Sequence, residues 1–182
     1  MKKTLVLTAA VVLSFGAIAN ASNPGTGGTL ALTGEVDGSI ALQIKTSDSG
    51  PITLASGANT AAATASIAAV SYYGTADNSS VSGFVKSHDS SNIILTGNFD
   101  VQVDKANITS TDYTLTAKMS SATDGLSWSL GGQTLGGSDA TVSSTDSYAT
   151  PVTHALVIKV PTSSGASTTL INNTIDLTAT AN

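Results

Sequence analysis

The chain has 182 residues, with seven lysines and no arginine against twelve acidic side chains, and it has no cysteine. Only 10% of the residues are charged and 41% are hydrophobic, which excludes a disordered, highly charged chain. The acidic balance also excludes the basic patches that nucleic acids and anionic membranes attract. Without disulfides a hydrophobic core must hold the fold, and the abundance of Thr, Ser, Gly, Ala and Val is typical of β-rich surface proteins.

Residues 1–21 have the features of a secretory signal peptide. Lys2 and Lys3 make a basic start, residues 4–18 form an apolar run, and the small residues at its end are typical of a cleavage site. The apolar run is too short for a transmembrane helix. We therefore predict cleavage after Ala21 and export of a mature chain of 161 residues with five lysines against twelve acids.

A two-residue alternation begins the mature chain after a flexible leader, SNPGTGG. From residue 30 to residue 44 the even positions are apolar or glycine, and the odd positions are mostly polar or small. One strand over this stretch would be about 50 Å long at roughly 3.3 Å per residue, which is too long for an ordinary sandwich. We therefore predict a leader and arm over 22–37, with the arm strand at 29–36, and a separate domain over 38–182.

The body of the chain contains short β-type runs that are separated by turn clusters of Gly, Asn, Asp and Ser. Regular short strands with such turns predict an all-β sandwich. The runs are 39–45, 52–55, 81–87, 92–104, 112–120, 126–130, 140–144, 152–160 and 173–181. A further run at 59–73 is rich in alanine, which favours a helix, but its Thr, Ser, Ile and Val favour a strand, and we predict a strand there.

No catalytic site, metal ligand set or cofactor site is predicted, and we expect that the chain is not an enzyme. His88 and His154 lie far apart, and a metal site needs several ligands in register. Asp100 and Asp104 are expected on the solvent-facing side of their strand, opposite two valines that face the core. A Gly-x-Ser-x-Gly motif is absent from the sequence. A secreted hydrolase that uses either histidine remains a third, poorly supported hypothesis.

Three aromatic residues are candidates for a ligand or subunit contact. Trp128 alternates with Leu126 and Leu130, so it is either a sugar-stacking platform or, as we favour, a core residue. Tyr72 and Tyr73 point to opposite faces of the predicted strand, so one of them is expected to be exposed and available to a neighbouring subunit.

Three short motifs resemble pilins of the cysteine-free alternate chaperone–usher, or colonisation-factor, class. The stretch LALTGEVDGSIAL, residues 30–42, resembles their N-terminal segment, in which a donor strand runs into a V-D-x-x-I/V-x-L start of the body. LSWSLGGQTL at 126–135 and NTIDLTATAN at 173–182 resemble two of their later strands. The usual proline after V-D is replaced by Gly38, and other secreted sandwich pilins fit nearly as well.

The resemblance implies an immunoglobulin-like sandwich that lacks one strand, passes through the periplasm with a chaperone, and is assembled at an outer-membrane usher into a surface fibre. The arm of a neighbouring copy would supply that strand. The residues expected to insert are Leu30, Leu32, Gly34 and Val36. The predicted function is therefore a structural fibre subunit that serves adhesion or biofilm. The alternative is a monomeric secreted sandwich that binds a carbohydrate or a surface partner.

Overall fold

The computed structural model describes residues 10–12, 29–31, 37–55, 61–121, 125–162 and 171–182. The chain divides into two units, one ending at Asp37 and the other beginning at Gly38. In the first unit, β1 (Ala10–Val12) pairs antiparallel with β2 (Thr29–Ala31).

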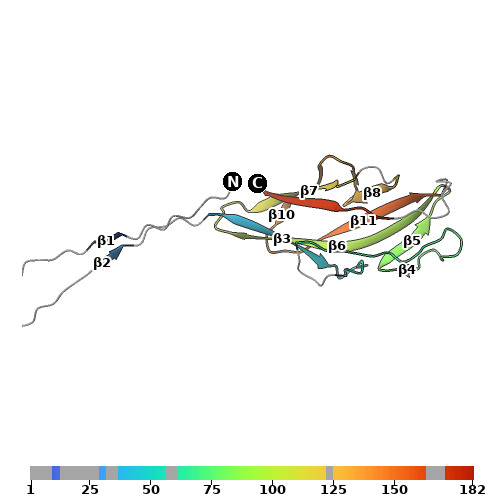
Figure 1. Ribbon diagram of the computed structural model, residues 1–182, viewed down its shortest axis with the longest axis horizontal. Helices are drawn as coiled ribbons and strands as arrows, with labels where there is room; N and C mark the ends of the chain where they lie inside the picture. Colours follow the sequence, from blue (N-terminus) through green and yellow to red (C-terminus); the bar gives the residue numbers. More distant parts are fainter. Residues whose placement is uncertain (1–9, 13–28, 32–36, 56–60, 122–124, 163–170) are drawn as a thin grey trace, which may run out of the picture. The chain divides into compact units, whose positions relative to one another are not determined.

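The second unit is an antiparallel all-β structure built from two sheets (Figure 1). Its strands are β3 (Ser39–Thr46), β4 (Ser80–Val81), β5 (Phe84–His88), β6 (Asn92–Ala106), β7 (Asp112–Met119), β8 (Ser127–Leu130), β9 (Gln133–Leu135), β10 (Ala140–Ser147), β11 (Val152–Pro161) and β12 (Ile175–Ala181). The larger sheet has the order β4-β5-β6-β11-β8-β9, with β3 also paired to β6, and the smaller has the order β10-β7-β12. The predicted β-sandwich class is confirmed.

The core lies between the central strands of the two sheets, where the sequence alternates most cleanly. In β7, Tyr113, Leu115 and Ala117 are completely buried, and the threonines between them face outward. In β6, Val101 and Val103 are completely buried as well. Their neighbours Asp100 and Asp104 lie on the outer face, where Asp100 accepts a hydrogen bond from Thr153 Oγ1 and Asp104 accepts one from Gln43 Nε2, both at 2.7 Å.

The predicted strand at 59–73 is wrong for the part that the structure describes. Residues 61–73 form neither a strand nor a helix, and their only β-type pairing is an isolated bridge between Ala65 and Leu54. The small alanine, serine and threonine side chains of this segment bury little apolar area, which leaves both regular structures weakly stabilised.

The long strand β6 defines two ends of this unit. We call the near end the one where β6 finishes: Ser39 pairs with Ala106 there, and the amide of Asn182 donates to the carbonyl of Asp112 at 3.2 Å. The far end is the one where β6 begins. There His88 pairs with Ile93, and the amide of Thr162 donates to the carbonyl of Ser91 at 2.8 Å.

Candidate functional site: a seam between two sheet edges

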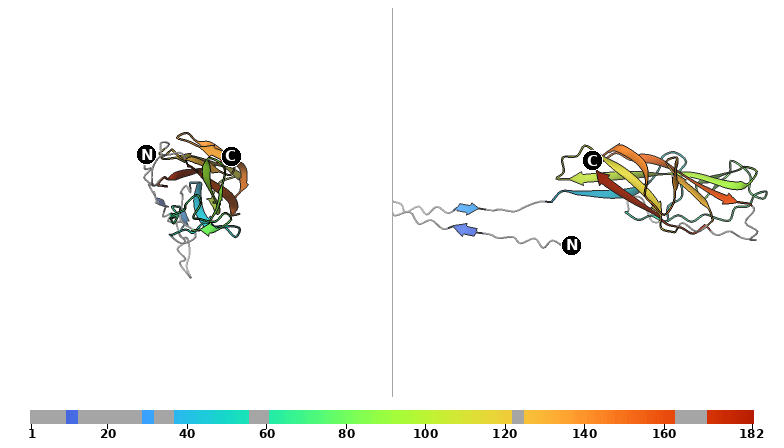
Figure 2. Two further views of the ribbon diagram at one scale, coloured as in Figure 1. Left: turned by 90° about the vertical axis from the view of Figure 1, so that its right-hand side faces the viewer. Right: turned by 90° about the horizontal axis from the view of Figure 1, so that it is seen from above.

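Two edge strands lie side by side along one flank of the second unit. Within the described residues, β3 pairs only with β6, and β12 pairs only with β7. Figures 1 and 2 both show β12 (dark red) beside β3 (blue), and residues of the two strands approach each other without forming a ladder. We call the space between these two edges the seam.

The side chains that face the seam are apolar but incompletely covered. Along β3 and β12, every second residue points toward the core, yet each keeps part of its surface in contact with water. These half-buried residues are Ile40, Leu42, Ile44, Ile175, Leu177 and Ala179. The equivalent positions of β7, which has a described strand on each side, are fully covered, so the exposure follows from the edge positions of β3 and β12 and not from a polar sequence.

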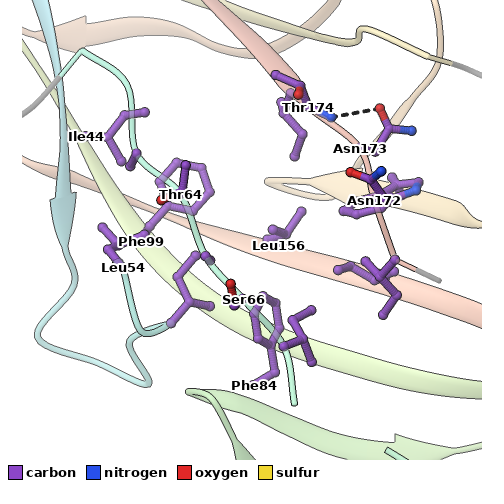
Figure 3. Close-up of a pocket in the computed structure, with 18 of the residues that line it drawn as sticks. Ile44, Leu54, Thr64, Ser66, Phe84, Phe99, Leu156, Asn172, Asn173 and Thr174 are labelled. Atoms are coloured by element: carbon purple, nitrogen blue, oxygen red, sulfur yellow. Dashed lines mark hydrogen bonds between the residues drawn. The ribbon is translucent and has the colours of Figure 1, made fainter. Parts of the chain in front are cut away.

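A cavity of about 710 Å³ opens along the seam (Figure 3). The larger sheet supplies one wall, the smaller sheet supplies Ile175 and Leu177, and the segment that precedes β12 closes one side. The apolar wall residues of the larger sheet are Ile44, Phe84, Phe99, Trp128, Leu156 and Ile158. Most of the lining is apolar, so an apolar guest that entered the cavity would remove this surface from water.

The strap, which we define as residues 61–70, runs along the cavity. Residues 62–67 line it, and Ile67 and Val70 pack against the core. Among the backbone bonds that hold the strap, the amide of Ala55 donates to the carbonyl of Thr64 at 2.7 Å. Residues 62–66 of the strap are alanine, serine and threonine, so the strap contributes small side chains to most of its part of the lining.

Of the predicted arm residues, only Leu30 lies within the described part of the chain. It belongs to β2, where its backbone pairs with Val11. Leu32, Gly34 and Val36 lie outside the described residues. The residues of the seam are described, and the side chains of the arm are not among the described parts of the chain.

Trp128 is buried, with 7% of its surface exposed, and its side chain lines the cavity. It offers no ring face to solvent, but its position would bring it into contact with a guest in the seam. The same alternation that placed Trp128 beside Leu126 and Leu130 also predicted its core position.

Tyr72 and Tyr73 lie at the far end, in a loop that is held by an ion pair between a buried lysine and a partly exposed aspartate. Lys86, with 1% of its side chain exposed, donates from Nζ to Asp77 Oδ1 at 2.6 Å and to the carbonyl of Tyr72 at 2.9 Å. Asp77 also contacts Nδ1 of His88 at 2.6 Å. The hydrogen bond from Lys86, followed by that from His88, lowers the pKa of Asp77 below its usual value.

The two tyrosines are arranged very differently. The hydroxyl of Tyr72 donates to the carbonyl of Asp89 at 2.7 Å, and its ring packs edge-on against His88, with ring centroids 4.6 Å apart. Tyr73 packs edge-on against Tyr72 and is 94% exposed. The expectation that one tyrosine of this pair is exposed agrees with this geometry, although the segment is a loop.

Sequence reasoning missed the β12 side of the seam and the buried lysine. Period-two spacing places Lys86 on the same strand face as Phe84, which was the available signal. The partner that makes this burial tolerable, Asp77, comes from a loop whose path the sequence pattern does not reveal.

The histidines do not form a recognisable catalytic arrangement. His154 is buried in the core, its Nε2 has no hydrogen-bond partner, and burial lowers its pKa. In the described part of the chain, no hydrogen bond joins a serine hydroxyl to His88 or His154. The same part contains no group of three or more His, Cys, Asp or Glu side chains arranged to hold a metal ion.

Comparison with protein-family models, curated protein sequences and solved structures found no match. Among the residues that the structure describes, there is no helix both long and apolar enough to cross a membrane. The seam is therefore the feature from which a function is inferred.

Proposed function

We propose that this protein is a structural subunit of an extracellular fibre, in which the N-terminal arm of one copy completes the sandwich of the next. The observation that carries the proposal is the seam: two neighbouring sheet edges without a ladder between them, above a large apolar cavity. An immunoglobulin-like sandwich with one strand removed would have this form.

The arm has the chemistry that the seam requires. Its even positions, Leu30, Leu32, Gly34 and Val36, would face inward as a strand, toward the half-buried aliphatic residues of β3 and β12. Its backbone would pair with the edge of β12. Glycine at position 34 suits a point where the cavity floor is shallow.

The lengths also agree. The arm of eight residues, 29–36, would span about 26 Å at roughly 3.3 Å per residue, and the seven residues of β12 span about 23 Å. One arm therefore matches the edge that it would cover. An arm exchanged between identical copies makes a heterologous contact that repeats without closing, which is what a fibre needs.

This function implies partners and a location outside the cytoplasm. The signal-peptide pattern of residues 1–21 supports export, and a subunit with an open seam would need a chaperone in the periplasm and an usher at the outer membrane. Adhesion or biofilm formation would be the biological use. We propose no enzymatic activity.

The alternative function is a monomeric secreted module that binds a carbohydrate or a surface partner. Tyr73 is the observation that favours it, because its exposed ring offers a stacking surface. In that case the arm would fold back onto its own seam, and no polymer would form.

A pair of variants in the arm separates the two functions. Leu32→Lys would bring an unpaired charge into the apolar cavity, while Thr33→Lys changes the opposite face of the same strand. Material sheared from expressing cells would be run on a detergent gel with and without boiling, since strand-exchanged polymers dissociate slowly.

We expect an unboiled ladder for the native protein and for Thr33→Lys, which collapses to one band on boiling, and no ladder for Leu32→Lys. A ladder for Leu32→Lys would contradict insertion of the arm. A single monomer band for the native protein in both lanes would favour the secreted binding module.

A further inference from the structure

We propose that the far end of each subunit, around Tyr73, is the surface on which the near end of the next copy rests in the fibre. This inference depends on the proposed function and adds a second contact to it. The first contact is the arm in the seam; the second joins the two bodies directly.

Within the body, the chain just before β3 lies close to the near-end loop. A Cβ atom on Gly38 would lie 2.3 Å from Cγ2 of Ile108 and 2.7 Å from the carbonyl oxygen of Asn107, so the chain passes closely over the loop between β6 and β7. Only Asp37 and Gly38 separate the predicted arm from β3. A linker of only two residues therefore joins the predicted arm to the near end of the body.

The direction of the inserted arm follows from the need for an open chain. β12 runs toward the near end, because Asn182 bonds to Asp112 there. An arm antiparallel to β12 would leave the seam on the far side of Ile175. An arm parallel to it would leave at the near end, where the accepting subunit's own arm also departs, so that one end would have to hold two neighbours. Only the antiparallel arrangement gives one neighbour at each end.

The emerging arm brings the next body close to Tyr73. The cavity is lined by Phe84, at the start of β5, and His88, at the end of the same strand, packs on Tyr72. Phe84 and His88 are four steps apart along the strand, which is about 13 Å, and the two-residue linker adds about 7 Å. The linker alone is shorter than the distance to His88. The next body is several strands wide, with the strands about 4.8 Å apart, so it would extend over the far end from the point where the linker emerges.

The loop that carries Tyr73 at the far end is held by several hydrogen bonds. The buried Lys86 holds the loop through Asp77 and the carbonyl of Tyr72, and Tyr72 is bonded to the carbonyl of Asp89. The ring of Tyr73 packs edge-on against the ring of Tyr72, and 94% of the surface of Tyr73 is exposed. A large aromatic side chain in a fastened loop binds at a low cost in conformational entropy, which is a property of contact residues.

Cross-linking in assembled fibres tests the contact, and the absence of native cysteines makes the experiment clean. One variant carries Tyr73→Cys with Thr109→Cys, where Thr109 is an exposed residue of the near-end loop. A second carries Tyr73→Cys with Asn182→Cys. The matched control carries Thr109→Cys with Thr141→Cys, since Thr141 is exposed and pairs with Thr116 in the middle of β7. Sheared material is treated with a short bis-maleimide and then boiled.

We expect covalent dimers and higher multimers after boiling for at least one of the Tyr73→Cys pairs, and monomer for the control. If the unboiled ladders form but neither Tyr73→Cys pair gives multimers, the end-to-end contact is wrong while the strand-exchange function stands. If no unboiled ladder forms for the native protein, both proposals are overturned. Multimers from the control at the same yield would also overturn the assigned contact.

Discussion

The central strand of the smaller sheet, β7, and its edge strand β12 differ in their neighbours more than in their sequences. β7 reads DYTLTAKM and β12 reads IDLTATA, and both alternate apolar and polar residues. The inward side chains of β7 are 0–4% exposed, whereas Ile175, Leu177 and Ala179 of β12 remain half-buried. Among the residues that the structure describes, β7 has a strand on each side, and β12 has one on a single side. Burial in this sheet therefore follows strand order: the inward side chains of the central strand are covered, and those of the edge strand β12 are half-exposed.

The largest effect is expected from a charged side chain introduced on the inward face of β12. Leu177→Lys places an ammonium group at the cavity wall, where it can still reach water in the free subunit but not beneath an inserted strand. We expect the variant to fold and to form no ladder on an unboiled gel. Thr178→Lys, on the exposed face of the same strand, is the control and should polymerise normally.

Circular dichroism of the free subunit decides whether Leu177→Lys acts on assembly. A melting temperature close to that of Thr178→Lys, together with the lost ladder, agrees with the account. A variant that keeps its ladder would show that the seam stays open in the fibre.

Truncation of matched leucines gives the next largest effect and measures the central strand and the edge strand on one scale. Leu115→Ala leaves a hole at a fully buried position and should lower the free energy of unfolding by about 3 kcal/mol. Leu177→Ala removes a half-buried side chain, which should cost the free subunit about 1 kcal/mol.

Denaturant titration of the free subunit checks both values. The order of the two costs is the essential result, and equal costs would mean that the seam is as well packed as the centre of the sheet. In the fibre, Leu177→Ala should lower the dissociation temperature of the ladder, because the inserted strand would lose a contact there.

Much of the architecture was predictable because alternation is a local property. The clean period of residues 112–119 and the buried positions of Val101 and Val103 follow from side chains that point to opposite faces. Strand order is not local. The period of β12 identifies a strand, but nothing in it reveals that one edge lacks a partner.

Close approaches were equally hidden from sequence reasoning. Gly38 replaces the proline that the family resemblance would place after V-D, and the sequence gives no reason for it. The structure supplies one: Ile108 and Asn107 lie where a side chain at position 38 would have to be. The burial of Lys86 likewise depends on a carboxylate from another loop.

A smaller effect concerns pH and the closed part of the sandwich. Burial lowers the pKa of His154 below its usual value near 6.5, and the charges of Asp146 and Asp100 oppose this only in part. Below pH 6.5 the unfolded chain therefore binds a proton more readily than the folded chain, and stability falls as the pH drops toward the folded pKa.

His154→Leu should remove that fall, because a leucine has no proton to bind and the buried Nε2 has no hydrogen bond to lose. Melting temperatures at pH 7.5 and pH 5 provide the measurement. The native protein should melt lower at the acidic pH, and the variant should change less. The lowered pKa values of Asp77 and Asp89 affect stability only at and below their ordinary value of 3.8, so they do not interfere. An equal drop in both proteins would contradict the role of His154.

The smallest expected effect is that of Tyr73→Ala on the free subunit. With 94% of the side chain in water, its removal should leave the melting temperature unchanged. The unboiled ladder should nevertheless dissociate at a lower temperature than that of the native protein. Thr141→Ala, an exposed change away from both ends, should alter neither quantity, and a similar response of the two ladders would argue against a contact at Tyr73.

Hydrogen exchange of the two strands, compared between the monomer and the sheared fibre, tests the seam most directly. β7 has partners on both sides, so peptides covering Asp112–Met119 should be protected in both states. For β12, the account predicts that part of the amides of Ile175–Ala181 exchange rapidly in the monomer and become protected in the fibre. The same exchange of β12 in both states would contradict the addition of a strand at the seam.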